Sequence, residues 1–529
     1  MQQTIQLKLL PAEAANAATV QQLIANTLGQ KQEAVTGFHI LKKSIDARSR
    51  TVWINLTVQA FVNEPFVERT LQQFSFLQVG GAAQKVVVIG AGPAGLFAAL
   101  ALLEAGIQPI ILERGKDVRA RRRDLAALNK EGVVNPESNY CFGEGGAGTY
   151  SDGKLYTRSS KRGDINRILQ LFVHFGAGEH ILYEAHPHIG TNKLPQIISA
   201  MRQLIVDCGG LFLFEQKVTD FITDDQKVLG VQTATGQRFD ADAFILATGH
   251  SARDIFTRLH QQGIVIEAKP FALGVRIEHP QALIDGLQYH ALQRNPLLPP
   301  ASYSMVQQVG ERGVFSFCMC PGGIIAPAAT APGELVVNGW SPSKRNNPFA
   351  NSGMVVQVQP EDALQSLKAA GHPVPAANNP LLLLQFQQMV EQMAFEAGGG
   401  GLVAPAQRMA DFCSGKVSAS LPACSYIPGL HSVDLRTVLP SFVHQALAAG
   451  FAAFGNKMRG YFTNEAVVVA TESRTSSPVR IPRHAETLVH PQLKNLYPCG
   501  EGAGYAGGIV SAAMDGERVA QVIAGRLGK

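Results

Sequence analysis

Three glycines and one glutamate have the spacing of a dinucleotide-binding turn. Gly90, Gly92 and Gly95 form a GxGxxG pattern after a β-branched run, and Glu113 follows the next apolar run. In such a turn the first glycine permits the sharp bend, the second lets a pyrophosphate approach the backbone, and the third lets a helix pack on a strand. A carboxylate at this distance suits the hydroxyls of a ribose. The chemistry expected here is the binding of a dinucleotide.

A strand, a helix and a second strand must position these residues. Residues 86–89 (VVVI) are typical of a buried parallel strand, and residues 107–112 predict the second strand. Pro93 and Ala94 begin the helix between them, where the missing N–H of proline costs nothing. The free N–H groups and the positive end of this helix suit phosphate. Arg114, next to the glutamate, is a further candidate for contact with the nucleotide.

A glycine-rich loop is the first of three later segments that bear on which dinucleotide binds. Residues 139–157 read NYCFGEGGAGTYSDGKLYT. So many glycines indicate that the backbone approaches a ligand closely, and their N–H groups suit an anion or the edge of a flat ring. Gly145 and Gly146 are the candidates for cofactor contact. A merely flexible loop is the alternative, but the aromatic residues in this segment are unlike a Gly/Ser linker.

An apolar strand that ends in Ala-Thr-Gly is the second segment. Residues 242–250 read DAFILATGH, after a hairpin predicted at 227–238. The small residues Ala247, Thr248 and Gly249 let the chain pass close to a bound nucleotide. His250 follows directly, so we expect it near the nucleotide rather than near the reacting atoms.

The third segment, residues 495–516, opens a long C-terminal helix. The positive end of that helix would stabilise the negative charge that a flavin ring gains on reduction. The candidate cofactor residues here are Gly500, Glu501, Gly507, Gly508 and Ile509. Because three separate segments agree on one nucleotide, FAD is the expected cofactor.

Together these segments resemble the glutathione-reductase-like FAD/NAD(P)-binding superfamily. Within it, CFGEGGAGTYSDGKL, FALGVRIEHP, CMCPGG and ESRTSSPVRIP are similar to an uncharacterised bacterial FAD-dependent dehydrogenase family. The resemblance covers residues 85–529. It implies bound FAD and dehydrogenase activity, and it supplies no substrate. Glu501 departs by one methylene group from the aspartate usual in the closing motif of this superfamily.

We expect an α/β chain with a discontinuous Rossmann-like FAD-binding domain. That domain would comprise residues 85–264 and 481–529, and an inserted α+β substrate or cap domain would occupy 265–480. Residues 1–80 predict a small N-terminal α+β domain with a ferredoxin-like arrangement. It carries no obvious chemistry, so a packing or docking role is expected.

The cap segment holds two candidate catalytic arginines. Arg276 ends a predicted strand, and its planar guanidinium suits a substrate carboxylate; a salt bridge is the alternative. Arg474 lies just before the chain re-enters the FAD fold, near the flavin ring or at an interdomain hinge. The polar loop at 341–351, with Lys344 and Arg345, is either a lid over the cleft or a surface loop.

Cys318 and Cys320 are the remaining catalytic candidates. A Cys-x-Cys pair could relay electrons from flavin to a disulfide, but two thiols on one strand do not automatically reach disulfide geometry. Lining of the cleft and packing in the core are the alternatives. A thiol–disulfide reductase is therefore one rival function, and a flavin-binding scaffold without redox activity is another.

The expected activity is hydride transfer between a small-molecule substrate and flavin N5. After the first motif, no second GxGxxG lies between two predicted strands, so a dedicated NAD(P)H domain is not expected. Either the substrate reduces the flavin directly or NAD(P)H enters the cleft transiently. No catalytic base can be named from the residues.

Composition fits this class of protein. The 529 residues are 46% hydrophobic with a net charge of +5, and the basic cluster at 119–123 (RARRR) is expected on a solvated helix face. Nucleic acid is not an expected partner. The N-terminus lacks a signal pattern, so a cytoplasmic location is expected. Glycines and Pro93 disfavour a membrane span at 86–103. Seven scattered cysteines predict neither a disulfide framework nor a metal site.

Overall fold

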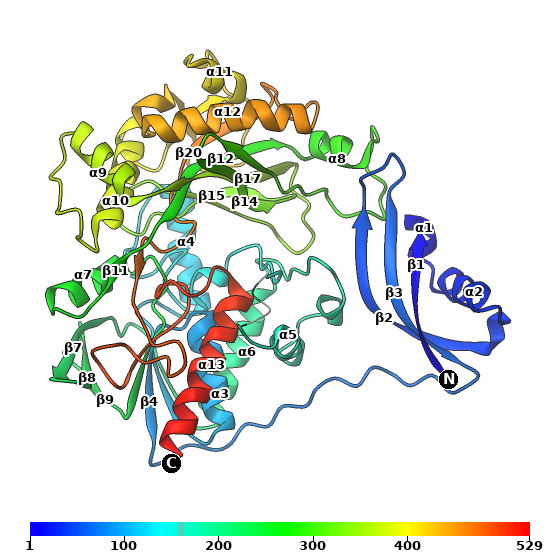
Figure 1. Cartoon of the computed structure of the whole chain (residues 1–529), viewed down its shortest axis with the longest axis horizontal. Coiled ribbons are helices and arrows are strands. Elements are labelled where there is room, and N and C mark those ends of the chain that lie inside the picture. The colour runs from blue at the N-terminus through cyan, green and yellow to red at the C-terminus, as the bar shows by residue number, and fades with distance from the viewer. Residues whose placement is uncertain (158, 160–161, 529) are drawn as a thin grey trace.

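A five-stranded parallel sheet carries the glycine motif (Figure 1). The computed structural model describes residues 1–157, 159 and 162–528. The sheet has the order β22-β10-β4-β5-β6, and every neighbouring pair is parallel. Its strands are β4 (Lys85–Ile89), β5 (Gln108–Leu112), β6 (Leu211–Leu213), β10 (Ala243–Leu246) and β22 (Leu496–Pro498). Because β22 joins the sheet beside β10, the end of the chain completes the fold that β4 begins.

Helices from distant parts of the chain cover one face of this sheet. They are α3 (Pro93–Glu104), α5 (Ile165–His174), α6 (Leu194–Asp207) and α13 (Ile509–Leu527). In Figure 1, α13 and α3 lie side by side, and a Cβ added to Gly516 of α13 would overlap the backbone of Ala94. The opposite face is covered by α7 (Arg253–Gln261) and by an antiparallel sheet of β7 (Val218–Asp224), β8 (Lys227–Thr233) and β9 (Arg238–Asp240).

A seven-stranded sheet forms the second large layer, drawn above the first in Figure 1. Its order is β13-β14-β17-β12-β20-β18-β19. The strands are β12 (Phe271–Pro280), β13 (Val306–Val309), β14 (Arg312–Cys320), β17 (Phe349–Val358), β18 (Ala404–Arg408), β19 (Leu430–Ser432) and β20 (Val467–Glu472). The long helix α12 (Ser441–Lys457) packs on it through buried apolar residues.

Smaller elements connect the layers. The ribbons are β11 (Glu267–Ala268) with β21 (Val479–Arg480), and β15 (Ile324–Pro327) with β16 (Val337–Trp340). Further α-helices are α4 (Val118–Glu131), α8 (Gln281–Tyr289), α9 (Pro360–Ala369), α10 (Leu382–Ala397) and α11 (Met409–Ser414). In the part of the chain that the structure describes, we find no helix that is both long and apolar enough to cross a membrane.

The N-terminal segment forms a separate three-stranded sheet (Figure 1). Strands β1 (Gln2–Leu9), β2 (Val35–Asp46) and β3 (Trp53–Val62) are antiparallel in the order β1-β3-β2, with α1 (Pro11–Ala14) and α2 (Ala17–Leu28) between β1 and β2. A complete ferredoxin-like fold needs a fourth strand and a second packing helix, and residues 63–84 contain neither. The N-terminal segment therefore has only the first part of the ferredoxin-like fold that was expected.

The hairpin of β2 and β3 contacts the body of the protein at two places. The Lys43 N–H donates to the Tyr183 carbonyl at 2.8 Å, and the Ala185 N–H donates to the Lys43 carbonyl at 2.9 Å. The His290 ring lies 3.2 Å from the Ala47 carbonyl. These contacts fix the hairpin between the segment around residue 184 and the end of α8.

Candidate functional site

A single cavity of about 800 Å³ is lined by residues of both large sheets and the loops between them. Of the predicted cofactor residues, all but Gly95, Gly145 and Gly500 line it. The cavity therefore brings together Gly90, Gly92, Pro93, Ala94, Glu113, Arg114, Gly146, Ala247, Thr248, Gly249, Glu501, Gly507, Gly508 and Ile509.

The glycines of the turn have three different environments. Gly90 has a φ of +102°, and a Cβ there would lie 2.6 Å from the Ala247 carbonyl oxygen. A Cβ on Gly95 would overlap the Gly90 carbonyl, so this glycine permits the close packing of α3 on β4. At Gly92 the nearest atom to an added Cβ is 3.9 Å away, and the residue faces the cavity. Open space at the second glycine is what a pyrophosphate requires.

Glu113 joins the glycine turn to the glycine-rich loop. Its carboxylate is buried and accepts three backbone hydrogen bonds of 2.9 Å, from Ala91, Gly115 and Gly143. The side chain also lines the cavity. A ribose contact, the role expected for Glu113, remains a prediction, while its role in positioning both loops is evident from the geometry.

Arg121 holds the glycine-rich loop from behind. Its side chain is fully buried and donates hydrogen bonds of 2.8–2.9 Å to four carbonyl oxygens, those of Asn139, Tyr140, Glu144 and Gly146. The expectation that the whole RARRR cluster lies on a solvated face is therefore wrong for Arg121. The signal that was missed is its spacing from the buried Leu125 and Leu128, which places the three on one face of α4.

The start of α13 forms another part of the cavity wall. A Cβ added to Gly507 or Gly508 would have no atom within 4 Å, so both glycines border open space at the positive end of a 19-residue helix. Burial raises the pKa of nearby Glu501 to about 7, although Lys269 opposes the shift. His250 lies 3.9 Å from Glu501, but burial and neighbouring arginines lower its pKa to about 3, so it is neutral at pH 7.

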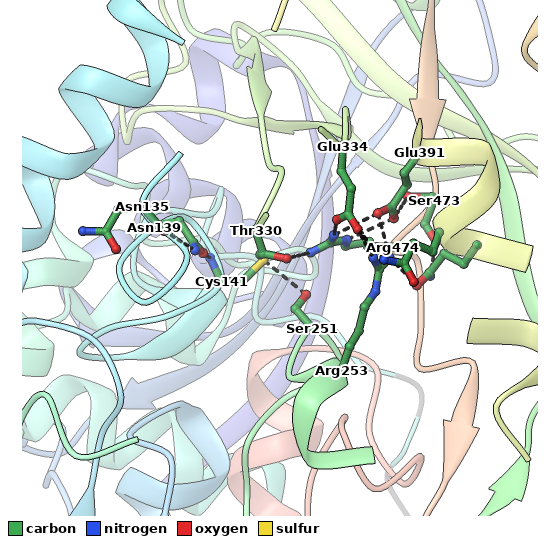
Figure 2. Close-up of polar contacts among 12 residues, drawn as sticks. Asn135, Asn139, Cys141, Ser251, Arg253, Thr330, Glu334, Glu391, Ser473 and Arg474 are labelled. Atoms are coloured by element: carbon green, nitrogen blue, oxygen red, sulfur yellow. Dashed lines mark hydrogen bonds and ion pairs between the residues drawn. The ribbon is translucent and has the colours of Figure 1, made fainter. Parts of the chain in front are cut away.

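Arg474 reaches the cavity wall from a buried ionic cluster (Figure 2). Its guanidinium donates to Glu391 at 3.0–3.1 Å, to Glu334 at 3.3 Å and to Thr330 at 2.7 Å. Arg253 contacts the same two glutamates at 2.6 and 3.0 Å. With two cations and two carboxylates the cluster is neutral, and most donors of Arg474 already have partners.

Cys318 and Cys320 face different environments. Cys318 lies where the register of β14 on β17 shifts, has a φ of +45°, and lines the cavity. Desolvation by the surrounding protein raises the pKa of its thiol to about 11. Cys320 is buried, and its thiol donates to the Cys318 carbonyl at 3.2 Å. The two residues therefore do not present a pair of thiols to the cavity.

Arg276 supports the wall without lining it. Its side chain is fully buried, pairs with Glu472 at 3.2 Å, and donates to Asn338 Oδ1 at 3.0 Å and to the Cys318 carbonyl at 2.7 Å. Of the two roles considered for Arg276, the salt bridge is the one observed. Burial raises the pKa of Glu472 to about 7, against the opposing charge of Arg276.

Three charged residues that meet in the cavity were missed in whole or in part from the sequence. Asp152 and Lys154 lie near the end of the glycine-rich segment, and Arg345 comes from the polar loop at 341–351. Both cations contact the Asp152 carboxylate, at 3.2 and 3.3 Å. Lys344, the other cation of that loop, is exposed. The position of Asp152 and Lys154 beside a run of glycines is the sequence signal that could have predicted their place in the cavity.

Sequence comparison gives a relative that spans nearly the whole chain. An uncharacterised protein of Clostridium beijerinckii is 38% identical over 518 residues, which is 94% of each protein. The profile of the FAD-dependent protein, C-terminal domain-like family matches residues 270–475. The chain belongs to the family of this Clostridium beijerinckii protein, and its residues 270–475 match the FAD-dependent C-terminal domain.

Further matches place the cofactor motif of this FAD-dependent protein. An FAD binding domain profile matches residues 83–126, the glucose inhibited division protein A profile matches 195–276, and a domain of unknown function matches 1–61. The protein binds FAD, and the open space at Gly92, Gly507 and Gly508 fits a dinucleotide. The cofactor prediction is confirmed.

Other similarities are narrower. The tRNA uridine 5-carboxymethylaminomethyl modification enzyme MnmG of Streptococcus pyogenes is 27% identical over 173 residues, 32% of this chain and 24% of that enzyme. The 2,6-dihydroxypyridine-3-hydroxylase of Arthrobacter nicotinovorans aligns with a TM-score of 0.35 and 11% identity over 84% of each chain. The flavin-dependent brominase Bmp2 aligns with a TM-score of 0.35 and 13% identity over 84% of this chain and 79% of that one. Alignments at this level transfer no activity.

Proposed function

We propose that the protein is an FAD-dependent oxidoreductase that transfers a hydride between a small molecule and flavin N5. The observation that carries the proposal is the continuity of the cavity. Residues of the FAD motifs and residues of the seven-stranded sheet, among them Phe317 and Cys318, line the same space of about 800 Å³. Cofactor sites of this kind occupy roughly 300–1,000 Å³. A substrate on the cap side would thus share one enclosure with the cofactor.

The residues of the cavity would bind, orient and exclude water. Bound FAD supplies the site that accepts or donates a hydride. Gly508 and Ile509 lie at the start of α13 on the cavity wall, so the positive end of the helix is directed toward the cavity. Negative charge that develops on the ligand would be stabilised there. Apolar side chains such as Ile509 and Met319 narrow the space left for water.

The order of elements supports a glutathione-reductase-like arrangement for the FAD domain. The glycine motif of β4 and α3 comes first, the sheet β7-β8-β9 precedes β10, and β22 with α13 closes the fold. We therefore assign the chain to that superfamily. Whether NAD(P)H enters the cavity transiently, or the substrate itself reduces the flavin, is decided by the reduction experiment below.

The thiol–disulfide alternative has less support. A dithiol mechanism needs an accessible thiolate and a second thiol within reach. The Cys320 thiol is buried, and the raised pKa of Cys318 keeps that thiol protonated at neutral pH. We expect any compound that reduces the flavin of the wild-type protein to reduce the flavin of Cys320→Ser at the same rate.

Anaerobic rapid mixing tests the proposed function. The purified holoprotein is mixed with NADH, with NADPH and with a panel of metabolites, and the loss of flavin absorbance is followed. Reduction by at least one compound, with multiple turnover when an acceptor is added, supports an oxidoreductase. A protein that retains FAD but is reduced by none of them would instead be a flavin-binding scaffold.

A further inference from the structure

The cations that line the cavity belong to three groups, and two groups are electrically balanced. One group, which includes the residue after Glu113, joins two cations to two carboxylates at 2.7–3.3 Å: Arg114, Lys217, Glu137 and Asp254. The ionic cluster of Figure 2 likewise joins two cations to two carboxylates: Arg253, Arg474, Glu334 and Glu391. Neither group offers surplus charge to a ligand.

The third group carries an uncompensated positive charge. Lys154 Nζ and the Arg345 guanidinium lie 3.2 and 3.3 Å from the same oxygen, Asp152 Oδ2. Among the residues that the structure describes, no other carboxylate lies within 4 Å of either cation. Two positive charges therefore share one negative charge.

The neighbouring histidines do not alter this balance. Burial and the positive charge of Arg345 lower the pKa of His188 to about 4, and the pKa of His186 is lowered by the same causes. Both rings are neutral at pH 7. The surplus of one positive charge is thus confined to Lys154 and Arg345 on the cavity wall.

Arg345 is fixed in place by its loop. Its φ is +48°, its N–H donates to the Pro342 carbonyl at 2.9 Å, and the adjacent Ser343 N–H donates to Asn192 Oδ1 at 2.8 Å. The Arg345 Nε atom is buried and has no hydrogen-bond partner. A guanidinium held in this way on the cavity wall suits a carboxylate, since a planar fork matches planar oxygens.

We propose that the substrate of the cavity is a small organic monocarboxylate whose carboxylate binds Lys154 and Arg345. The single surplus charge matches a monoanion. Trp340 and Phe317, which line the same space, would contact the apolar body of the molecule. This inference rests on the proposed function, because it names the class of substrate for that same site.

Binding of benzoate to the holoprotein, followed by the flavin absorbance spectrum, tests the proposal without turnover. Benzamide serves as the neutral probe of the same shape. We expect benzoate to perturb the spectrum and benzamide not to do so at equal concentration. Arg345→Gln should weaken benzoate binding about ten- to a hundredfold, the loss expected for a charged hydrogen bond. Lys344→Gln removes the same charge from the same loop on the exposed side and should bind as wild type.

Three outcomes would overturn the proposal. Equal binding of benzoate and benzamide would show that charge is not recognised. Wild-type benzoate binding in Arg345→Gln would remove the arginine from the site. The third outcome has two parts: Arg345→Gln loses FAD, and neither benzoate nor the linear monocarboxylate pyruvate changes the flavin spectrum of the wild-type protein. It would show that Lys154 and Arg345 bind FAD and not a substrate. Each outcome is independent of the reduction experiment, so a failed anion site and a failed oxidoreductase are distinguishable.

Discussion

The guanidinium of Arg121 donates a hydrogen bond of 2.8 Å to the carbonyl oxygen of Gly146, a residue of the cavity wall. Gly146 in turn lies against the first glycine turn, where its Cα is 3.9 Å from the position of a Cβ on Gly92. A buried cation behind the loop thus sets the backbone that faces the cofactor. The shape of this loop is therefore held by a side chain that does not line the cavity.

Arg121→Met should therefore lower both the FAD content and the stability of the protein. The substitution leaves two buried and two partly buried carbonyl oxygens without their donor, and the loss is expected to reach roughly 3 kcal/mol. FAD content per protein and the Tm are the measurements. Arg123→Met, an exposed neighbour on the same helix, should retain both. Full FAD occupancy in Arg121→Met would contradict the positioning role.

Gly95→Ala tests the packing of α3 on β4. The added methyl would overlap the Gly90 carbonyl, which belongs to the backbone and cannot move aside, so we expect little folded, FAD-loaded protein. Gly525→Ala is the matched control because it also lies in a helix, α13, with no atom within 4 Å of the added Cβ. It should leave the Tm unchanged or raise it, since alanine favours helix by about 1 kcal/mol over glycine. Wild-type yield and FAD content in Gly95→Ala would disprove the packing argument.

Sequence patterns within short segments predicted the parts of the fold that depend only on residues close together in the chain. The glycine turn from Gly90 to Gly95, the Ala-Thr-Gly strand end and the start of α13 are each short segments whose backbone requirements select their residues, and the structure places them on one cavity. The N-terminal unit was harder, because a three-stranded sheet and the first half of a ferredoxin-like fold share the same strand and helix pattern.

Long-range contacts account for what the sequence did not reveal. Asp152 and Arg345 are 193 positions apart and meet only because two loops pack together, so no spacing predicts their ion pair. Arg276 has the residue type of an anion-binding group, but it is buried and paired with Glu472 of the neighbouring strand. Residue type suggested the chemistry, and tertiary pairing decided which cation remains available.

Arg253→Gln tests the balanced cluster of Figure 2. Arg253 and Arg474 together lower the pKa of Glu391 to about 2 in spite of its burial. Removing one cation leaves two buried carboxylates with one partner, which typically costs about 3–5 kcal/mol. We expect a lower Tm, with the deficit shrinking at acidic pH as a glutamate protonates. Arg258→Gln, on the same helix with a half-exposed partner, should change the Tm far less.

Glu501 should give the FAD-free protein a pH-dependent stability. Its pKa is about 7 in the folded state against 4.5 for an ordinary glutamate, so the folded state binds the extra proton between these values. Stability should therefore fall as pH rises from about 4.5 to 7, by roughly 2–3 kcal/mol, and then level off. Thermal unfolding across this range should show a smaller fall for Glu501→Gln. Glu472 contributes equally in both proteins, so identical curves would rule out the raised pKa of Glu501.

Cys318 should react slowly with alkylating agents although it faces the cavity. With a thiol pKa of about 11, on the order of one molecule in a thousand carries the reactive thiolate at pH 8. The rate of iodoacetamide labelling at Cys318 is followed by peptide mass spectrometry. This rate should rise about tenfold per pH unit, with no plateau up to pH 9.5, which is roughly one unit above the pKa of an ordinary cysteine. Glutathione in the same samples provides the reference, and Cys318→Ser assigns the signal. A plateau near neutral pH would reveal an activated thiolate and would restore the thiol–disulfide mechanism.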